Sequence, residues 1–274
     1  MWEFEKFQEQ IALIDENTFL TYKELMEYTD KMKQILEERS FCFLLCDAGI
    51  GPMIHYISMI ENRVVPLLLD VKIDKKLLQE LINEYQPDYL CVPENLDEYQ
   101  EEKAIEHSYG YKTIEWSKAK RQPLYEDLAL LLSTSGSTGS NKLVRLSYKN
   151  IYSNAKSISE YLQLDETERP ITTLPMNYTY GLSIINSHLL VGATILVSSR
   201  TFIQKGFWEF FEKHGATSFG GVPATYDILY KSVSSYIDEA EKETFKTALV
   251  AFTITTLCAV SVAKVTDCIV AVCV

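Results

Sequence analysis

The sequence predicts an α/β fold built from layered, mostly parallel sheets with helices on their faces. Two runs, residues 41–46 and 64–69, are apolar throughout, and strands of this kind are buried on both faces in parallel sheets. Helical patterns with one apolar face alternate with them, over residues 53–62 and, capped by Asp74, up to residue 85, and a third short strand follows at 89–92. This alternation is typical of parallel sheets joined by right-handed crossovers.

The segments on either side of this unit are less regular. The chain opens with a short predicted strand at residues 11–15 and a helix at 22–39. Thr21 and Glu24 have the form of a capping box, in which the threonine accepts from a first-turn amide and the glutamate reaches back to the cap amide. Residues 94–122 are polar and acidic, with a possible strand at 111–116, and we interpret them as a surface excursion.

After residue 123 the alternation of strand and helix continues. Ser147 can cap a helix that runs to residue 162, because its hydroxyl can accept from a free amide of the first turn. The predicted strands are 128–132, 143–146, 171–175, 192–197 and 216–219, and the further predicted helices are 183–190 and 207–213.

Composition and charge limit the classes of function. With 274 residues, of which 47% are hydrophobic and 23% charged, the chain can bury a large core. Its net charge of −12 disfavours a nucleic-acid partner. The six cysteines and four histidines show no metal-ligand or disulfide spacing, so no metal site is predicted. Cys42 and Cys46 share one face of a predicted strand, which indicates buried free thiols in a reducing cytoplasm. Residues 1–6 lack the features of a signal peptide.

The most informative stretch is residues 133–142, which are rich in serine and threonine, contain two glycines and end in a lysine. It joins two predicted strands. Glycines let a backbone approach a ligand closely, amides and hydroxyls then point at that ligand, and a lysine adds positive charge. A flexible surface loop is the alternative, but the flanking strands and the closing lysine favour a phosphate cradle. The spacing fits neither the P-loop of NTPases nor the dinucleotide fingerprint.

The stretch resembles the phosphate-binding loop of the adenylate-forming enzymes, which include acyl-CoA synthetases, adenylation domains of peptide synthetases and luciferases. In that family the loop usually reads Thr-Ser-Gly-Ser-Thr-Gly-x-Pro-Lys. Asn141 stands where the family has proline. The matching residues are Thr134, Ser135, Gly136, Ser137, Thr138, Gly139 and Lys142.

The resemblance implies ATP as a ligand of this loop. Thr134, Ser137 and Thr138 would donate hydroxyl hydrogen bonds to the phosphates, and Lys142 would balance their charge. Lys142 and Thr138 are therefore the expected catalytic residues. The family also uses Mg²⁺, for which we find no ligands in this sequence. The large N-terminal domain of the family, with its layered sheets, is the expected fold.

Two later stretches support the resemblance. Family members commonly read Pro-x-x-His-x-x-Gly after the loop, with an aromatic residue just before the glycine, at the pocket for the carboxylate substrate. Pro175, Tyr180 and Gly181 match this pattern, and Tyr178 takes the histidine position. Plain packing aromatics are the alternative for the two tyrosines. A Gly-Val-Pro stretch near the acyl pocket is matched at Gly221, Val222 and Pro223, although proline at a helix start also has a structural reason.

The resemblance covers roughly residues 21–231, after which the chain changes character. We divide it into an N-terminal α/β subdomain (1–122), a phosphate-loop and acyl-pocket subdomain (123–246) and an atypical apolar tail (247–274). The tail contains no Gly, Pro or Asn, and its only charges are one lysine and one aspartate. It is open to three interpretations: a non-native end such as a frameshift leaves, which we rank first, a β-prone tail, or a membrane-inserting segment.

The expected activity is ATP-dependent activation of a small-molecule carboxylate as an acyl-adenylate, with transfer of the acyl group to the thiol of CoA or a carrier protein. The family's Tyr-Gly-x-Thr-Glu segment, ribose-binding aspartate and C-terminal lysine are not found, which predicts a truncated chain with impaired catalysis. The alternatives are an inactive fragment or nucleotide-binding module, and an interaction protein whose tail enters a membrane or a partner.

Overall fold

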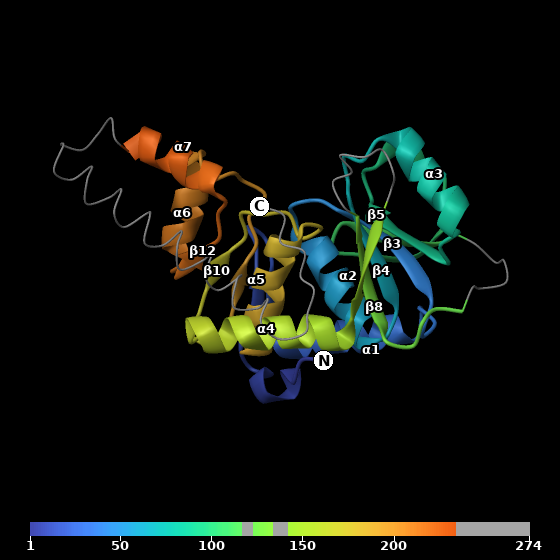
Figure 1. Cartoon of the computed structure of the whole chain (residues 1–274), viewed down its shortest axis with the longest axis horizontal. Coiled ribbons are helices and arrows are strands. Elements are labelled where there is room, and N and C mark those ends of the chain that lie inside the picture. Colours follow the sequence, from blue (N-terminus) through green and yellow to red (C-terminus); the bar gives the residue numbers. More distant parts are fainter. Residues whose placement is uncertain (117–122, 134–141, 234–274) are drawn as a thin grey trace.

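The computed structural model describes residues 1–116, 123–133 and 142–233 of the chain (Figure 1). The strands are β1 (Ile11–Ile14), β2 (Phe19–Thr21), β3 (Phe41–Cys46), β4 (Val65–Asp70), β5 (Tyr89–Pro93), β6 (Ala104–Ser108), β7 (Tyr111–Glu115), β8 (Leu128–Ser133), β9 (Leu143–Ser147), β10 (Pro170–Ile171), β11 (Ile195–Leu196) and β12 (Ser218–Phe219). The α-helices are α1 (Tyr22–Lys33), α2 (Ile50–Glu61), α3 (Lys75–Tyr85), α4 (Tyr148–Leu162), α5 (Thr179–Leu190), α6 (Lys205–Lys213) and α7 (Pro223–Val233).

The described strands form two sheets. One has seven strands in the order β6-β7-β5-β3-β4-β8-β9, and the other has five in the order β12-β10-β11-β1-β2. The central pairings β5–β3–β4–β8 and β12–β10–β11–β1 are parallel, and antiparallel pairs flank them. The α/β class of layered, mostly parallel sheets flanked by helices is therefore confirmed.

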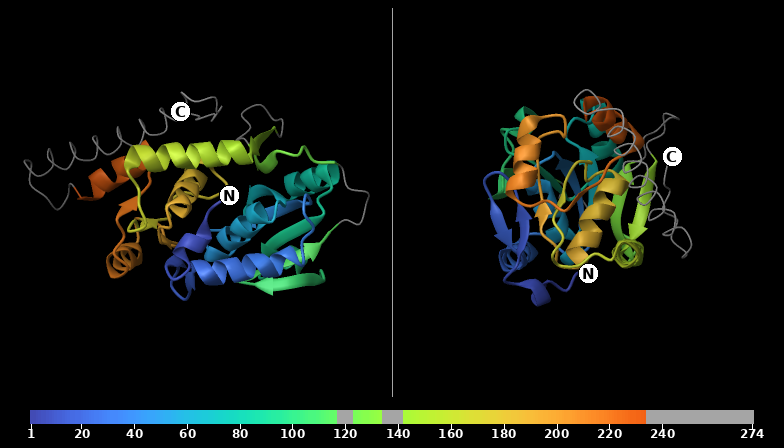
Figure 2. Two further views of the ribbon diagram at one scale, coloured as in Figure 1. Left: turned by 90° about the horizontal axis from the view of Figure 1, so that it is seen from below. Right: turned by 90° about the vertical axis from the view of Figure 1, so that its left-hand side faces the viewer.

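Side chains of alternate residues along β3 enter different cores, which places the seven-stranded sheet between two helical layers. Cys42 and Leu44 pack with α1, α2 and α5 in the main core, whereas Phe43 packs with α3 on the opposite face. The five-stranded sheet closes the main core from the other side, and its outer face packs on α6 through Phe207. Figures 1 and 2 show α2 and α5 between the two sheets, with α4 packed on α5.

The predicted caps are confirmed. Thr21 and Glu24 form the capping box of α1, Asp74 caps α3, and Ser147 caps α4 together with Asn150. Cys42 and Cys46 are buried free thiols on one face of β3, as predicted.

Several predicted helix boundaries are wrong. The helix predicted over residues 22–39 ends at Lys33, because Gln34 and Ile35 bond three residues back and tighten the chain into a turn toward β3. The helix predicted from residue 53 begins at Ile50, since Pro52 lies in its first turn, where a missing N–H costs nothing.

The predicted surface excursion over residues 94–122 contains β7, which confirms the strand expected at 111–116, and also β6, an unexpected edge strand with alternating partial exposure. The sequence did not reveal β6, because polar residues alternate along it and it lacks the apolar run of a buried strand. In contrast, the strands predicted at 171–175, 192–197 and 216–219 have only two ladder residues each. The other residues of these three predicted strands lie in loops that side-chain hydrogen bonds hold in place.

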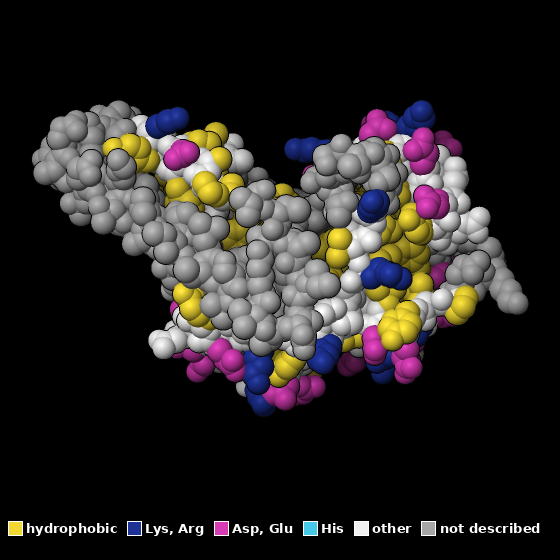
Figure 3. Space-filling view, in the orientation of Figure 1, with side chains coloured by type: hydrophobic (Ala, Val, Ile, Leu, Met, Phe, Trp, Pro, Cys, Tyr) yellow, Lys and Arg dark blue, Asp and Glu magenta, His cyan; other side chains and the backbone are white. Residues whose placement is uncertain are grey.

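Both sheets take strands from the two predicted subdomains, 1–122 and 123–246. Where the chain divides into separate units stays a prediction, and the tail from residue 247 lies outside the described residues. Among the helices that the structure describes, none has the length and apolar character to cross a membrane. On the face in Figure 3, acidic and basic side chains are interspersed along the lower rim, and apolar side chains gather around α7.

Candidate functional site

The parallel strands of the seven-stranded sheet end at one edge, where polar residues follow them. Cys46 at the end of β3 pairs with Asp70 at the end of β4, and Leu68 of β4 pairs with Leu132 of β8. Ser133, the first residue of the glycine-rich stretch, therefore lies at the same edge one strand beyond Asp70. Ligands of open α/β sheets bind at the carboxyl ends of the strands, so this edge is the place to look for a site.

The glycine-rich stretch is the connection of a β-hairpin. β8 and β9 are antiparallel, and the last ladder pair is Ser133 with Leu143, so both ends of the connection are fixed on the sheet. Lys142 is exposed at its second end. The other predicted residues of the loop, Thr134, Ser135, Gly136, Ser137, Thr138 and Gly139, lie outside the described residues.

A cavity of about 370 Å³ lies between the carboxyl edges of the two sheets. One wall consists of residues 46–49 after β3 and 70–72 after β4, and the other of residues 172–177 after β10 and 197–202 after β11. Its size falls in the range of small-molecule sites. The loops after parallel strands from both sheets thus enclose one cavity, which no single sheet would form.

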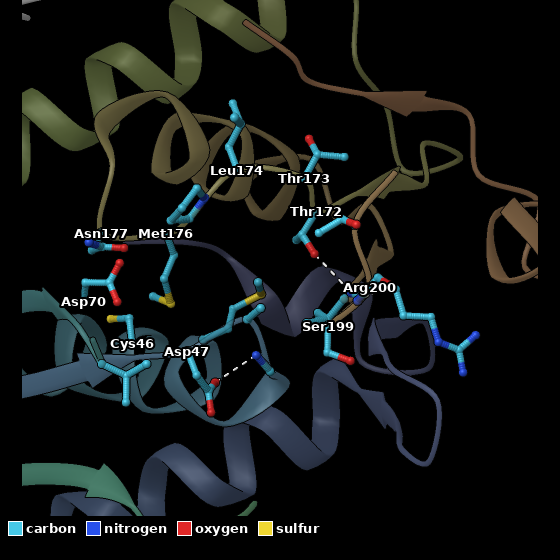
Figure 4. Close-up of a pocket in the computed structure, with 18 of the residues that line it drawn as sticks. Cys46, Asp47, Asp70, Thr172, Thr173, Leu174, Met176, Asn177, Ser199 and Arg200 are labelled. Atoms are coloured by element: carbon cyan, nitrogen blue, oxygen red, sulfur yellow. Dashed lines mark hydrogen bonds between the residues drawn. The ribbon is translucent and has the colours of Figure 1, made fainter. Parts of the chain in front are cut away.

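Figure 4 shows Cys46, Asp70 and Asn177 close together at one end of this cavity, with the Met176 side chain pointing between them and Asp47. Burial raises the pKa of the Cys46 thiol, which is therefore uncharged at neutral pH. The apolar interior with a few polar groups at the rim suits a small organic ligand better than an ion.

Arg200 is on the opposite wall, and its guanidinium points away from the cavity (Figure 4). It donates to the carbonyl of Gly206 at 3.0 Å and lies 3.7 Å from the carboxylate of Glu16. Thr172 on the same wall accepts from the Ser198 amide at 3.1 Å, and this bond joins the loops after β10 and β11.

The first turn of α5 carries the predicted pocket residues Tyr178, Tyr180 and Gly181. Tyr178 is the N-cap residue and is 44% exposed. A Cβ atom at Gly181 would lie 2.3 Å from the carbonyl oxygen of Pro175, so only glycine allows the helix to approach that loop. The helix begins at Thr179 rather than at the predicted residue 183, because this approach lets the first turn start directly after the cavity loop.

The Gly-Val-Pro stretch lies beside this turn. The Thr173 hydroxyl donates to the carbonyl of Gly220, and a Cβ at Gly220 would lie 3.6 Å from the Tyr180 hydroxyl. Gly221 adjoins the ring of Tyr226, and Pro223 is the first residue of α7. Burial, aided by the nearby Tyr180, raises the pKa of Tyr226. Tyr180, Gly181, Gly221 and Pro223 are thus brought together, next to the loop that lines the cavity.

Sequence reasoning missed the cavity residues Asp47, Asp70 and Asn177. Each directly follows, or closely follows, a strand that was predicted, and a polar residue at the carboxyl end of a buried parallel strand is the signal that could have found them. Among the described residues, no three His, Cys, Asp or Glu side chains are grouped so as to hold a metal ion.

The profile of a protein family described as AMP-binding enzyme matches residues 2–264. The chain belongs to the AMP-binding enzyme family. The resemblance to adenylate-forming enzymes found in the motifs is therefore confirmed, and the AMP-binding match continues past residue 231, where the motifs ended.

Curated relatives of this AMP-binding chain are CoA ligases. Sulfoacetate–CoA ligase of Cupriavidus necator is 34% identical over 95 residues, which are 35% of this chain and 19% of that protein. 2-Succinylbenzoate–CoA ligase of Bacillus velezensis is 24% identical over 204 residues, or 70% of this chain and 42% of that protein. The chain thus spans well under half the length of the curated relatives that it matches.

Solved structures agree on the AMP-binding fold. The O-succinylbenzoate coenzyme A synthetase of Bacillus subtilis in complex with AMP has a TM-score of 0.67 at 20% identity, covering 86% of this chain and 63% of that one. The same enzyme in complex with ATP and a magnesium ion has a TM-score of 0.63 at 21% identity, covering 82% and 63%. At these identities the likeness establishes the fold alone.

Proposed function

We propose that this chain supplies the ATP- and acid-binding part of an AMP-forming acid–thiol ligase. In the reaction, a carboxylate oxygen attacks the α-phosphorus of ATP, the bond to the bridging oxygen breaks, and pyrophosphate leaves. The acyl-adenylate then loses AMP when the thiol of CoA or a carrier protein attacks its carbonyl carbon. The observation that carries the proposal is the glycine-rich hairpin connection at the same sheet edge as the cavity, in a chain of the AMP-binding family.

The phosphate loop would act through positioning and charge. Thr134, Ser137 and Thr138 would donate to the β- and γ-phosphates, and Ser135, Gly136 and Gly139 would let the backbone amides approach them. Lys142 would balance the charge that develops on the leaving pyrophosphate, with Thr138 as the second catalytic group. The pairing of Ser133 with Leu143 supports this role, because it fixes both ends of the loop on the sheet before ATP binds.

The acid would bind in the cavity between the sheets. Its carboxylate would face the phosphate loop at the Asp70 end, and its remainder would contact the apolar interior. Tyr178, Tyr180, Gly181, Gly221 and Pro223 would form the adjoining wall, with the Tyr178 hydroxyl as a donor where the family has histidine. Sulfoacetate, 2-succinylbenzoate and oxalate, the acids in the names of matched ligases, are the first acids to try.

Magnesium would offset phosphate charge when ATP is bound, and a solved relative contains both. The part of this chain that the structure describes holds no grouped ligand set for it. We therefore assign no residue of this chain to the metal and derive no step from it. ATP and CoA as substrates fit a cytoplasmic location, where the buried thiols stay reduced.

ATP–pyrophosphate exchange with a panel of carboxylates tests the activity, and calorimetric titration with ATP tests the loop. The Lys142→Ala variant should bind ATP about tenfold or more weakly, because it loses a charge-assisted contact. Lys149→Ala, which removes an exposed lysine from α4, is the matched control and should bind as the wild type does.

ATP binding without exchange for any acid would favour the alternative of a nucleotide-binding module. Equal ATP affinity of the Lys142→Ala variant and the wild type would contradict the phosphate cradle.

A further inference from the structure

One wall of the cavity, residues 46–49, continues β3 beyond the point where β5 accompanies it. The last β3 residue that pairs with β5 is Leu44. On that side, the carbonyl of Leu45 and the amide of Asp47 therefore have no strand partner. Both groups instead bond to one side chain: the Tyr111 hydroxyl donates to the Leu45 carbonyl at 2.9 Å and accepts from the Asp47 amide at 3.2 Å. The phenol thus takes the place of the missing strand residue on either side of Cys46.

Tyr111 is itself firmly held. It is the first residue of β7, pairs with Pro93 and is 2% exposed. Its ring fills the space above the first turn of α2, where a Cβ at Gly51 would lie 2.5 Å from the ring. One turn further along α2, the His55 ring lies with its centroid 5.5 Å from that of Tyr111. Burial raises the pKa of Tyr111, so its hydroxyl stays protonated and keeps its donated bond at any physiological pH.

We propose that Tyr111 is a positioning residue of the cavity, which holds residues 46–49 in the conformation that lines it. Tyr111 does not line the cavity itself, so it acts through Asp47 and Cys46. The link to substrate rests on the proposed function, in which the acid occupies this cavity. The placement of the loop, however, can be measured without any substrate.

The Tyr111→Phe variant keeps the ring and removes both hydrogen bonds. Cys46 reports on the loop, because its thiol lines the cavity, whereas Cys42 and Cys91 are buried elsewhere in the core. We expect the rate at which iodoacetamide labels Cys46, relative to Cys91, to rise about tenfold in this variant, as measured by mass spectrometry. A general loss of stability would raise the labelling rates of both cysteines, so it would leave the ratio of the Cys46 rate to the Cys91 rate unchanged.

Tyr28→Phe is the matched control. Tyr28 is also a buried tyrosine with two side-chain hydrogen bonds, to His55 at 3.0 Å and to Ser108 at 2.8 Å, and neither of these partners lines the cavity. Its removal should leave the Cys46 to Cys91 ratio unchanged. An unchanged ratio in Tyr111→Phe, or an equal rise in both variants, would overturn the positioning role.

The wild-type protein allows a test without any variant. In hydrogen-exchange measurements, the Asp47 amide should exchange about tenfold or more slowly than the Ala48 amide, because it donates to Tyr111. Fast exchange of the Asp47 amide would overturn the proposal. For the carboxylic acid that gives the highest rate of ATP–pyrophosphate exchange, the affinity of the protein for that acid should fall about tenfold in Tyr111→Phe and not in Tyr28→Phe. If the wild type binds no acid, the proposed function fails, while the labelling ratio still decides whether Tyr111 holds the loop.

Discussion

β3 and β4 of the seven-stranded sheet pair along six residues each, whereas β10 pairs with β11 at one residue and with β12 at two. The five-stranded sheet makes up for its short ladders with threonine side chains. Thr172 accepts from the Ser198 amide, Thr194 donates to the Ile11 carbonyl at 2.7 Å, and Thr217 accepts from the Arg169 amide at 2.8 Å. Backbone hydrogen bonds between long strands hold the seven-stranded sheet together, whereas side-chain hydrogen bonds from the loops largely hold the five-stranded sheet.

This difference matches the division of roles at the cavity. The long ladders of the seven-stranded sheet fix the edge to which the glycine-rich hairpin is attached. The short strands of the five-stranded sheet leave residues 172–177 and 197–202 as loops, and these loops form the second wall. Binding residues are commonly found on loops that a rigid scaffold positions. Substitutions that weaken the packing of the seven-stranded sheet, or the side-chain hydrogen bonds of the five-stranded sheet, test this difference between the two sheets.

The largest effect should come from the backbone-held sheet. Phe43 of β3 is fully buried, and Phe43→Ala should lower the free energy of unfolding by about 3–5 kcal/mol, because it leaves a cavity that the close-packed sheet cannot fill. Urea denaturation measures this. Phe19→Ala on the edge strand β2, where the ring is 55% exposed, should cost less than about 1 kcal/mol. Similar losses at both positions would contradict the comparison.

Acid should weaken the helix layer that supports the same sheet. Burial lowers the pKa of His55 on α2 from 6.5 to about 4. Between these two pKa values the unfolded chain takes up a proton that the native protein does not. Stability should therefore fall by up to roughly 3 kcal/mol as the pH drops through this window.

His55→Asn should be less stable at neutral pH, but its stability should depend less on pH in that window. Urea denaturation of both proteins at pH values from about 7 to about 4 measures the difference in slope. Equal slopes would mean that His55 has the same pKa in the native and unfolded states.

The smallest effect should come from a single hydroxyl of the loop-held sheet. Thr172→Val removes the acceptor of the Ser198 amide and should cost about 1 kcal/mol of stability. Thr113→Val in β7 is the matched control, because among the described residues the partner of that hydroxyl is the weakly accepting Cys91 sulfur, at 3.8 Å. The control should be close to neutral in thermal denaturation. A larger loss at Thr113 would show that side chains also hold the seven-stranded sheet.

The same contrast explains which elements the sequence could predict. β3 follows residues 41–46 as predicted, since a strand buried on both faces is apolar at every position. Capping residues such as Ser147 were also correct, because their chemistry is local. The ends of β10 and β11 could not be predicted, since they depend on partners such as Thr172 and Ser198 that lie far apart in the sequence.

Prediction of the site divides in the same way. Gly181 was chosen by its motif, and its close contact with the Pro175 carbonyl gives a physical reason for glycine there. The cavity wall at Asp47 and Asp70 was missed, because its position depends on the registration of β3 with β4. Tyr111 could not have been found, since its two bonds cross from one sheet strand to the end of another.

The pairing of β1 with β11 has a consequence for the order in which the chain folds during synthesis. Leu13 pairs with Ile195, so β1 emerges from the ribosome about 180 residues before its neighbour does. At usual translation rates this delay is roughly ten to forty seconds. The seven-stranded sheet has all of its strands by Ser147, well before β11 exists. Until β11 is synthesised, the edge of β1 that pairs with it stays open, and an open apolar strand edge in a nascent chain favours aggregation and chaperone binding.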